Sequence, residues 1–271
     1  MNDQEYAYLR RKVQQLLGID IDQYKEKQMR RRLEAFVARQ APDDMPRFIA
    51  HLEHDEKALK DFKDVLTIHV SEFFRDPAQF RSLERTVLPG LLRESPVLKI
   101  WSAACSHGAE PYSIAIALAE LRHADGHKII ATDIDEGVLK RATAGGPYHP
   151  DELRNVSGPR LRKYFLPSGG GYNVVEDVRK RVQFYVRDLL RDNFESGFDL
   201  IVCRNVIIYF SGDAKRRLLR KLYESLKPGG VLFLGGTEAL LDRSAASFER
   251  LFGNFYRKAA TPGGVRREWA A

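Results

Sequence analysis

The strongest constraint on the fold is a change of pattern near residue 96. Before it, residues 1–95 carry apolar residues at helical spacing and almost no strand signal; Met29, Leu33, Phe36 and Val37 share one face of a helix. After it, short apolar runs alternate with amphipathic stretches. The runs are VLKIWSA, KIIATD, VQFYV, FDLIVC and VLFLGG. Such alternation is typical of parallel strands joined by right-handed crossover helices, so we predict a helical domain followed by a doubly wound α/β sheet.

The same pattern predicts where the domains of the chain lie. A helical N-terminal domain with its linker is expected over residues 1–90, and the sheet domain over residues 91–258. Residues 147–181 interrupt the alternation with the glycine-rich run SGGGY, which predicts an inserted β-subdomain with a hairpin around Tyr164–Leu166 and Tyr172–Val175. Residues 259–271 are expected to be a flexible tail.

Composition narrows the class of protein. The chain has 271 residues, of which 44% are hydrophobic, and this excludes disorder as the main state. Its two cysteines, Cys105 and Cys203, argue against a disulfide framework and are expected to pack as small apolar side chains without a metal. The start MNDQEY lacks the features of a secretory signal, and no apolar run reaches the ~18 residues that span a bilayer. We expect a monomeric cytoplasmic protein without direct membrane insertion.

The segment SAACSHGAEPYS is the first candidate for a ligand site. It follows a predicted strand, turns at Gly108 and opens a helix at Glu110 and Pro111. Ligands of open α/β sheets bind at the carboxyl ends of strands. The phosphate-binding pattern G-x-G-x-x-G is absent, and the acidic Glu110 suits a cationic amino or sulfonium group better than a pyrophosphate. His107, inside the turn, is expected to be exposed rather than to act as a base.

An acidic residue ends the next predicted strand. Asp133, in ATDID, stands about 20 residues after the turn, where a carboxylate accepts hydrogen bonds from ribose hydroxyls. A strand-terminal Asp is equally common as the N-cap of the following helix, and that interpretation stays open. Together, Glu110 and Asp133 indicate a nucleoside site without phosphates, which matches the shape of S-adenosylmethionine.

Two later strand ends are expected at the same rim of the sheet. Asp188 and Leu189 follow VQFYV, and Arg204, Asn205 and Tyr209 lie in CRNVIIYF. A polar residue after a strand can merely cap the next helix. The residues after Asn205 are too apolar for an ordinary solvent loop, and this favours a functional role.

Five segments of the chain, in this order, resemble the CheR family of chemotaxis-receptor glutamate methyltransferases. They are LTIHVSEFFRDPAQF, SAACSHGAEPYS, TDID, CRNVIIYF and LKPGGVLFLGGTE. The resemblance implies a Rossmann-like, class I S-adenosylmethionine-dependent methyltransferase fold with an all-α N-terminal domain and a small inserted β-subdomain. It also implies the activity: methyl transfer to glutamates on the cytoplasmic coiled coil of methyl-accepting chemotaxis proteins, giving a γ-methyl ester and S-adenosylhomocysteine.

The resemblance assigns roles to individual residues. The implied cofactor contacts are His69, Ser71, Arg75, Glu110, Asp133, Asp188, Leu189, Arg204 and Asn205, with Tyr209 next to the methyl-transfer site. Arg75 and Tyr209 are the candidate catalytic residues, because a buried glutamate anion needs a cation or hydroxyl to offset its lost hydration. No general base is needed, since a carboxylate with a reference pKa of about 4.3 is already ionised at neutral pH.

Two departures from the family pattern keep other interpretations open. The family usually has Asn at the position of His69, which can equally be a structural residue, and a second acid at the position of Ala109. A non-enzymatic module that binds the cofactor without transferring methyl is one alternative. A nucleic-acid methyltransferase is another, but CRNV replaces the base-binding motif expected after the fourth strand, so we expect no nucleic-acid partner.

The positive charge of the chain is concentrated in one predicted helix. The chain has 44 Lys and Arg against 37 Asp and Glu, a formal net charge of +7, and basic residues gather between Lys25 and Arg39. A solvated helix face would explain this density. Within the resemblance, the helix belongs to the domain that meets the glutamate-rich receptor, so Lys27, Arg30 and Arg31 are candidate docking residues.

Overall fold

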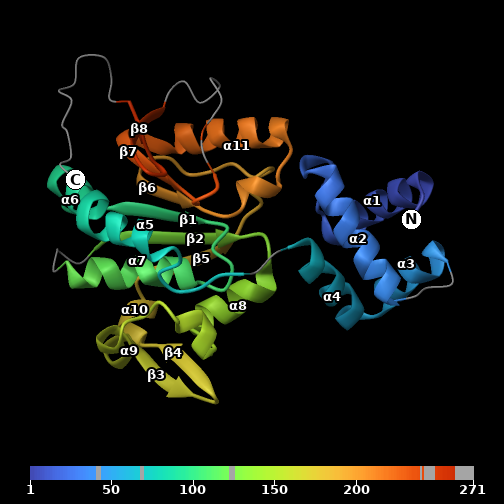
Figure 1. Ribbon diagram of the computed structural model, residues 1–271, viewed down its shortest axis with the longest axis horizontal. Coiled ribbons are helices and arrows are strands. Elements are labelled where there is room, and N and C mark those ends of the chain that lie inside the picture. Colours follow the sequence, from blue (N-terminus) through green and yellow to red (C-terminus); the bar gives the residue numbers. More distant parts are fainter. Residues whose placement is uncertain (41–43, 68–69, 122–125, 239, 241–247, 260–271) are drawn as a thin grey trace. The chain divides into compact units, whose positions relative to one another are not determined.

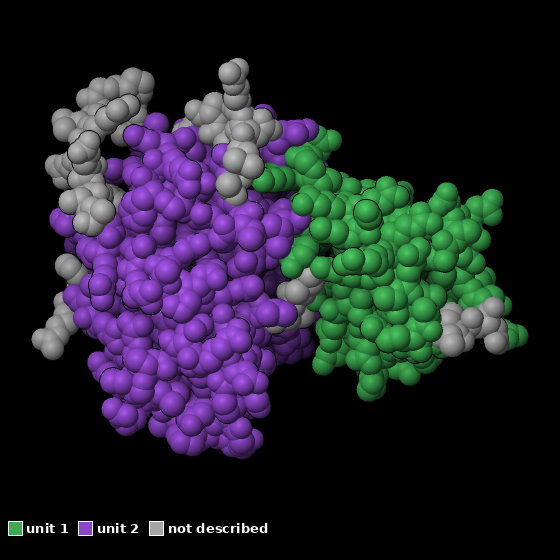
Figure 2. All heavy atoms as spheres, viewed as in Figure 1, with its two compact units in different colours: residues 1–69, 209–215 green, residues 70–208, 216–271 purple. Residues whose placement is uncertain are grey.

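The computed structural model describes residues 1–40, 44–67, 70–121, 126–238, 240 and 248–259. The chain divides into two compact units (Figure 2). Residues 1–69 and 209–215 form the first, which we call the helical unit, and residues 70–208 and 216–271 form the second, the sheet unit. Within the described residues, no helix is both long enough and apolar enough to cross a membrane. The tail expected at 259–271 lies outside the described residues except for its first position.

The helical unit is built from α1 (Asp3–Leu17), η1 (Ile21–Gln23), α2 (Glu26–Gln40), α3 (Met45–His54) and α4 (Glu56–Leu66) (Figure 1). Short polar side chains determine where three of these helices begin. Asn2, Asp44 and Asp55 each accept a hydrogen bond from a backbone N–H of the first turn of α1, α3 and α4, respectively. These N–H groups have no partner inside the helix, so the caps stabilise the helix starts.

Aromatic side chains form the centre of the helical unit. The ring centroid of Phe36, on α2, lies 6.2 Å from that of Phe48 and 5.3 Å from that of Phe62. Phe48 and Phe62 meet edge to face at 5.8 Å. Met29 and Leu33 lie on the same buried face of α2, which confirms the helical face predicted from their spacing.

A segment from the far end of the chain also belongs to the helical unit. The N–H of Lys25 donates to the carbonyl oxygen of Tyr209 at 2.8 Å, and Phe210 pairs with Tyr24 through an isolated antiparallel bridge and a ring contact of 5.3 Å. The guanidinium carbon of Arg32 lies 4.9 Å from the centroid of the Tyr209 ring. Tyr209 is therefore held by the N-terminal part of the chain, although it follows a strand of the sheet unit.

The sheet unit contains a seven-stranded sheet in the order β5-β2-β1-β6-β7-β9-β8. Its parallel strands are β1 (Lys99–Ala103), β2 (Lys128–Asp133), β5 (Val182–Val186), β6 (Phe198–Cys203) and β7 (Leu226–Leu234). These are the five runs predicted from the sequence. The antiparallel hairpin of β8 (Phe248–Phe252) and β9 (Phe255–Lys258) was not expected. The order reverses between β1 and β6, which is the place where open α/β sheets bind ligands.

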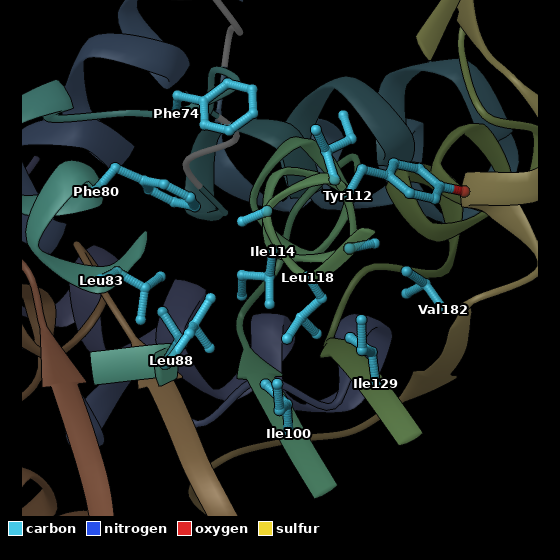
Figure 3. Close-up of a cluster of buried hydrophobic side chains, with 14 of the residues drawn as sticks. Phe74, Phe80, Leu83, Leu88, Ile100, Tyr112, Ile114, Leu118, Ile129 and Val182 are labelled. Carbon is cyan, nitrogen blue, oxygen red and sulfur yellow. The ribbon is translucent and has the colours of Figure 1, made fainter. Parts of the chain in front are cut away.

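Helices cover both faces of this sheet. In Figure 1, α7 (Ala109–Glu120) lies on one face and α11 (Gly212–Ser225) on the other, as the predicted Rossmann-like class requires. The remaining helix near β2 is α8 (Glu136–Ala144). Ile100 and Ile129 point from β1 and β2 toward α7, where they meet Leu118 in a buried cluster (Figure 3).

The N-terminal segment of the sheet unit contributes to that cluster. It forms α5 (Pro77–Ser82), the π-helical turn η2 (Leu83–Val87) and α6 (Leu88–Glu94). Phe80 and Leu88 are buried in the same cluster as Ile100 (Figure 3). Because this apolar face packs on the sheet core, residues 77–94 belong to the sheet unit.

The insertion contains η3 (Pro150–Leu153), α9 (Gly158–Tyr164), β3 (Phe165–Ser168), β4 (Gly171–Val174) and α10 (Glu176–Arg179). Strands β3 and β4 pair antiparallel, and their positions agree with the predicted hairpin. Arg160 of α9 contacts Glu84 at 2.7 Å and Glu120 at 2.6 Å. Its side chain thereby ties the insertion to η2 and to the end of α7.

Candidate active site

A buried ion-pair network lies at the carboxyl ends of β1 and β6, where the sheet order reverses. The side chain of Arg204, directly after β6, is only 1% exposed. Its Nη2 donates to Asp76 Oδ2 at 2.5 Å and to the carbonyl oxygen of Arg75 at 3.0 Å, and its Nη1 lies 3.4 Å from Glu110 Oε2. Arg204 thus connects the start of α7 with the segment that precedes α5.

Glu110 lies in the first turn of α7, and its side chain is 12% exposed. Its Oε1 accepts a hydrogen bond of 2.7 Å from Ser102 Oγ on β1. Burial raises the pKa of the Glu110 carboxyl above its ordinary value, and the charge of Arg204 and the Ser102 hydrogen bond act in the opposite direction. A carboxylate held in this way is suited to bind a cationic ligand group, because it already lies in a site with little water.

The backbone of the turn after β1 is strained. Ala104, Ser106 and Gly108 have φ values of 60°, 51° and 91°. A non-glycine residue in the left-handed region costs about 1–3 kcal/mol, and such residues cluster at functional sites. The other described non-glycine residues with positive φ are Phe74, Asp76 and Asn205, which lie in the two segments that contain or contact Arg204.

Gly108 is required for packing as well as for backbone conformation. A Cβ at this position would lie 3.0 Å from the Cβ of Ala142 on α8 and 3.2 Å from the ring of Tyr112. The sequence suggested that this glycine allows a ligand to approach the backbone. The structure gives a closer reason, the contact between the turn and α8.

The expectation that His107 is exposed is wrong, because the residue is only 4% exposed. Its Nε2 lies 3.1 Å from Glu152 Oε1, and Glu152 Oε2 accepts from Arg141 at 2.6 Å. The hydroxyl of Tyr148 donates to the carbonyl oxygen of His107 at 2.7 Å. The first residues of the insertion therefore hold the strained turn in place.

Asp133 is buried at the end of β2. Its Oδ2 accepts the N–H of Ser106 at 2.8 Å, and its Oδ1 accepts the N–H of Asp135 at 3.0 Å. The N-cap of α8 is Asp135, so the alternative that Asp133 caps this helix is wrong. Asp133 therefore places a carboxylate at the carboxyl end of β2, where carboxylates of open α/β sheets accept hydrogen bonds from ribose hydroxyls.

Asp188 and Leu189 lie beside Asp133 because β5 neighbours β2. The N–H of Arg187 donates to the carbonyl oxygen of Asp133 at 2.9 Å. Asp188 is half-buried and accepts the N–H of Leu190 at 2.8 Å, whereas the side chain of Leu189 is buried. The end of β5 thus offers an apolar side chain and a carboxylate at the same edge of the sheet.

The remaining predicted residues of the sheet unit lie close to this network along the chain. Ser71 is half-buried, and Nη1 of the half-buried Arg75 donates to the carbonyl oxygen of Val70 at 2.7 Å. Arg75 is also near enough to Glu110 to lower the pKa of that carboxyl. His69 lies outside the described residues.

The predicted docking residues lie on α2 of the helical unit, and they differ in exposure and in ion pairing. Arg30 is bound by the unit's own acids, with Nη1 at 2.7 Å from Asp3 and Nε at 3.2 Å from Glu34. Lys27 and Arg31 are exposed. The guanidinium of Arg30 already has two carboxylate partners, and its role in docking stays a prediction.

Sequence reasoning missed the role of Glu238. This carboxylate is 1% exposed and accepts hydrogen bonds from the N–H groups of Asn205 and Gly235. The pattern GGTE contains no signal for the contact with Asn205, because that donor lies 33 residues earlier in the chain.

The two cysteines lie next to these contacts in the chain, since Cys105 precedes Ser106 and Cys203 precedes Arg204. Cys105 and Cys203 are buried free thiols, and burial raises the pKa of each well above its ordinary value. No group of potential metal ligands gathers within the part of the chain that the structure describes. A cavity of about 140 Å³ is lined by Trp101, Thr132, Glu195 and other residues. Polar groups of its lining have protein partners, because Trp101 donates to Thr132 and Glu195 contacts Lys99.

Comparison with known proteins identifies the family. Residues 4–67 match the family domain described as CheR methyltransferase, all-alpha domain, and residues 69–256 match CheR methyltransferase, SAM binding domain. This chain belongs to the CheR methyltransferase family. The two family domains correspond to the helical N-terminal part and the sheet-containing part of the chain. The predicted fold class and the S-adenosylmethionine cofactor are thereby confirmed.

Curated CheR-family relatives resemble this chain over nearly its whole length. A chemotaxis protein methyltransferase of Listeria innocua is 39% identical over 94% of this chain and 98% of its own. One of Listeria monocytogenes is 40% identical over the same shares. Chemotaxis protein methyltransferase 1 of Pseudomonas aeruginosa is 35% identical over 84% of this chain and 87% of its own. These similarities support S-adenosylmethionine-dependent methylation as the general activity of the family.

The side chains of the sheet unit fit the cofactor of a CheR methyltransferase. S-adenosylmethionine carries cationic ammonium and sulfonium groups, a ribose diol and an adenine ring, and it has no phosphate. Glu110 and Asp133 provide buried carboxylates at the ends of two strands, and Leu189 provides apolar surface at the end of β5. Arg204 is already bound to Glu110, Asp76 and a backbone carbonyl, so it organises the acids.

Proposed function

We propose that this chain transfers methyl groups to glutamate side chains on the cytoplasmic domains of methyl-accepting chemotaxis proteins. The products are a glutamate γ-methyl ester and S-adenosylhomocysteine. The observation that carries the proposal is the buried Glu110, paired with Ser102 and Arg204 at the carboxyl ends of parallel strands, in a chain of the CheR family. The names of the curated relatives support a role in chemotaxis.

The cofactor supplies the methyl group on a positively charged sulfur. In the proposed site, Glu110 binds the cationic amino acid end of the cofactor, Asp133 accepts from the ribose hydroxyls, and Leu189 packs on the adenine. The hydrogen bonds already made by both carboxylates restrict their rotation. Such preorganisation lowers the entropy lost when the ligand binds.

The acceptor glutamate needs to be placed rather than activated. Its carboxylate is ionised at neutral pH, so alignment with the methyl group provides much of the rate enhancement. We assign the compensation of its charge to Arg75 and Tyr209. Arg75 is half-buried and donates from Nη1 to a backbone carbonyl, which leaves further guanidinium N–H groups for a carboxylate.

Docking is assigned to the exposed basic residues of α2. Lys27 and Arg31 are exposed and form no ion pair within the described residues, so their charges are available to an acidic helical partner. Opposite charges accelerate encounter between two proteins, and salt screens this effect.

A methyl-transfer assay tests the proposal. The purified chain is incubated with methyl-labelled S-adenosylmethionine and the purified cytoplasmic fragment of a methyl-accepting receptor from the same organism, or with RNA or duplex DNA. Label on the receptor fragment that is released as methanol by mild alkali is expected, because carboxyl esters are alkali-labile. Label on nucleic acid would support the nucleic-acid alternative.

A variant of Arg75 separates a functional role from a structural one. Arg75→Ala is expected to lose most transfer while keeping the melting temperature within a few degrees. If the wild-type chain binds S-adenosylhomocysteine in a calorimetric titration but labels none of the organism's receptor fragments, the non-enzymatic alternative replaces the proposal.

A further inference from the structure

We propose that Glu238 is a positioning residue that locks the backbone after β6 and thereby sets Arg204 and Glu110 for cofactor binding. The inference deepens the proposed function, and it rests on that function only where methyl transfer is the readout. Neither the family pattern nor the sequence assigned Glu238 a role. The argument depends on three features: the contacts of its carboxylate, the strain of its neighbour Asn205, and the absence of a side chain at Gly235.

The carboxylate of Glu238 is directed at backbone donors. Its Oε2 accepts the N–H of Asn205 at 2.7 Å and that of Gly235 at 2.8 Å, and its Oε1 accepts the N–H of Ile208 at 3.3 Å. The side chain joins two loops that follow adjacent strands, β6 and β7. Charge-assisted hydrogen bonds of this kind are stronger than neutral ones, and a buried carboxylate depends on them for solvation.

Asn205 needs such a partner. Its φ is 59°, a left-handed conformation that persists only where surrounding contacts determine it. Arg204 is the preceding residue, so the hydrogen bond at the Asn205 N–H also controls the direction in which the Arg204 side chain leaves the backbone. A turn of the peptide plane between the two would move the guanidinium away from Glu110 and Asp76.

Gly235 allows the close approach that the lock requires. A Cβ there would lie 2.6 Å from Glu238 Oε2 and 2.9 Å from the backbone nitrogen of Asn205. Real Cβ contacts do not approach this closely, so any side chain would push the carboxylate away from its donors. Adjacent Gly236 differs. Among the described residues, a Cβ there would meet only the side-chain nitrogen Nε2 of Gln79, at 3.0 Å.

The same loop leads to Tyr209. Ile208, the third donor to Glu238, directly precedes Tyr209, whose carbonyl oxygen accepts the N–H of Lys25. The backbone from Asn205 to Ile208 is thus fixed by Glu238, and Tyr209 is fixed by the helical unit. Loosening Glu238 is therefore expected to release the backbone between Asn205 and Ile208, within the sheet unit.

A purely structural role is the competing explanation, and Asp199 provides the control. Asp199 is a buried carboxylate at the opposite end of β6 and accepts the N–H of Lys99 at 2.7 Å. Glu238→Gln and Asp199→Asn each replace a carboxylate oxygen with an N–H donor beside a backbone donor. Both are expected to lower the melting temperature, but only Glu238→Gln affects the candidate active site.

Backbone amide hydrogen exchange on the cofactor-free chain tests the lock directly. Faster exchange at Asn205 and Gly235 is expected in Glu238→Gln, with protection elsewhere in β6 and β7 retained. Asp199→Asn should leave these two amides unchanged. Unchanged exchange at Asn205 and Gly235 in Glu238→Gln would overturn the proposed contacts.

Cofactor binding and kinetics test the consequence. In Glu238→Gln, the dissociation constant for S-adenosylhomocysteine is expected to rise on the order of tenfold and kcat to fall similarly, since small misplacements of a site cost rates of this size or more. The KM for the receptor fragment should stay near the wild-type value. Equal losses in Asp199→Asn, or wild-type binding in Glu238→Gln, would show that Glu238 is structural only.

Two glycine variants provide an independent check. Gly235→Ala is expected to reproduce both the faster amide exchange and the weaker S-adenosylhomocysteine binding, whereas Gly236→Ala should resemble the wild type. Identical behaviour of the two variants would contradict the inference. If the wild-type chain methylates no receptor, the proposed function fails, but the exchange and binding measurements still decide the role of Glu238.

Discussion

Arg204 and Glu110 lie 94 residues apart in the sequence, yet their side chains meet at 3.4 Å. The contact exists because β1 and β6 are neighbours in the sheet, so that the residues after each strand reach the same edge. Ser102 and Asp76 complete the set of partners. The charge balance of this buried group determines how the candidate site responds to substitution and to pH.

Removing the cation of this group is expected to destabilise the fold strongly. Arg204→Met leaves Glu110 buried without its ion-pair partner, and breaking a buried pair in this way typically costs about 3–5 kcal/mol. The double variant Arg204→Met with Glu110→Gln should recover a substantial part of that loss. Urea unfolding of both variants measures the difference, and a double variant no more stable than Arg204→Met would contradict the assigned pairing.

Substitution of Glu110 is expected to separate stability from binding, with a definite pH dependence. The pKa of Glu110 is raised in the folded chain, mainly by burial, so its contribution to stability is present below about 4.5, the ordinary value, and is lost as pH rises through the folded pKa. Glu110→Gln lacks this loss. The melting temperature of Glu110→Gln relative to the wild type should therefore increase as pH rises from 4.5 toward neutrality.

The same variant should bind the cofactor poorly. Calorimetric titration of Glu110→Gln with S-adenosylhomocysteine is expected to show a dissociation constant at least about tenfold above the wild-type value, since a hydrogen bond to a charged group contributes about 1.5–3 kcal/mol. If the difference in melting temperature between Glu110→Gln and the wild type stayed constant between pH 4.5 and 7, the raised pKa of Glu110 would be disproved.

Two variants of Tyr209 distinguish a role of its hydroxyl in methyl transfer from a role of its ring in packing. Tyr209→Phe keeps the aromatic face that Arg32 contacts and removes only the hydroxyl. We expect kcat for receptor methylation to fall about tenfold or more with an unchanged melting temperature, because the hydroxyl would donate to a charged carboxylate. Tyr209→Ala should in addition lower the melting temperature through loss of the cation–π contact. Wild-type kcat in Tyr209→Phe would restrict Tyr209 to packing.

Docking by α2 predicts a salt-dependent effect of charge reversal. Lys27→Glu with Arg31→Glu is expected to slow association with the receptor fragment at low salt, and the difference should largely disappear at 1 M salt, where the Debye length is about 3 Å. Lys57→Glu with Lys60→Glu, on the exposed surface of α4, is the control for the same change in net charge. Stopped-flow association rates that are equal for the two charge reversals at low salt would exclude α2 as the docking surface.

Local pattern was sufficient to predict the fold class and the cofactor. The five parallel strands are contiguous apolar runs, and the buried face of α2 follows helical spacing, so neighbours in sequence carry the signal. Glu110 and Asp133 were recognisable because each directly follows a predicted strand, and the carboxyl ends of parallel strands share one edge. The five contiguous segments that resemble the CheR family indicated which kind of methyltransferase this chain is.

The relationships that complete the site arise from tertiary structure. His107 meets Glu152, and Glu238 meets Asn205, because the insertion and the strand order bring distant segments together. Tyr209 lies against Arg32 because residues 209–215 pack within the helical unit. A single sequence contains no periodicity that links such pairs, since each member alone looks like an ordinary loop residue. The sequence by itself determined the architecture and the class of ligand, and only the folded sheet decided which charges and backbone donors pair around it.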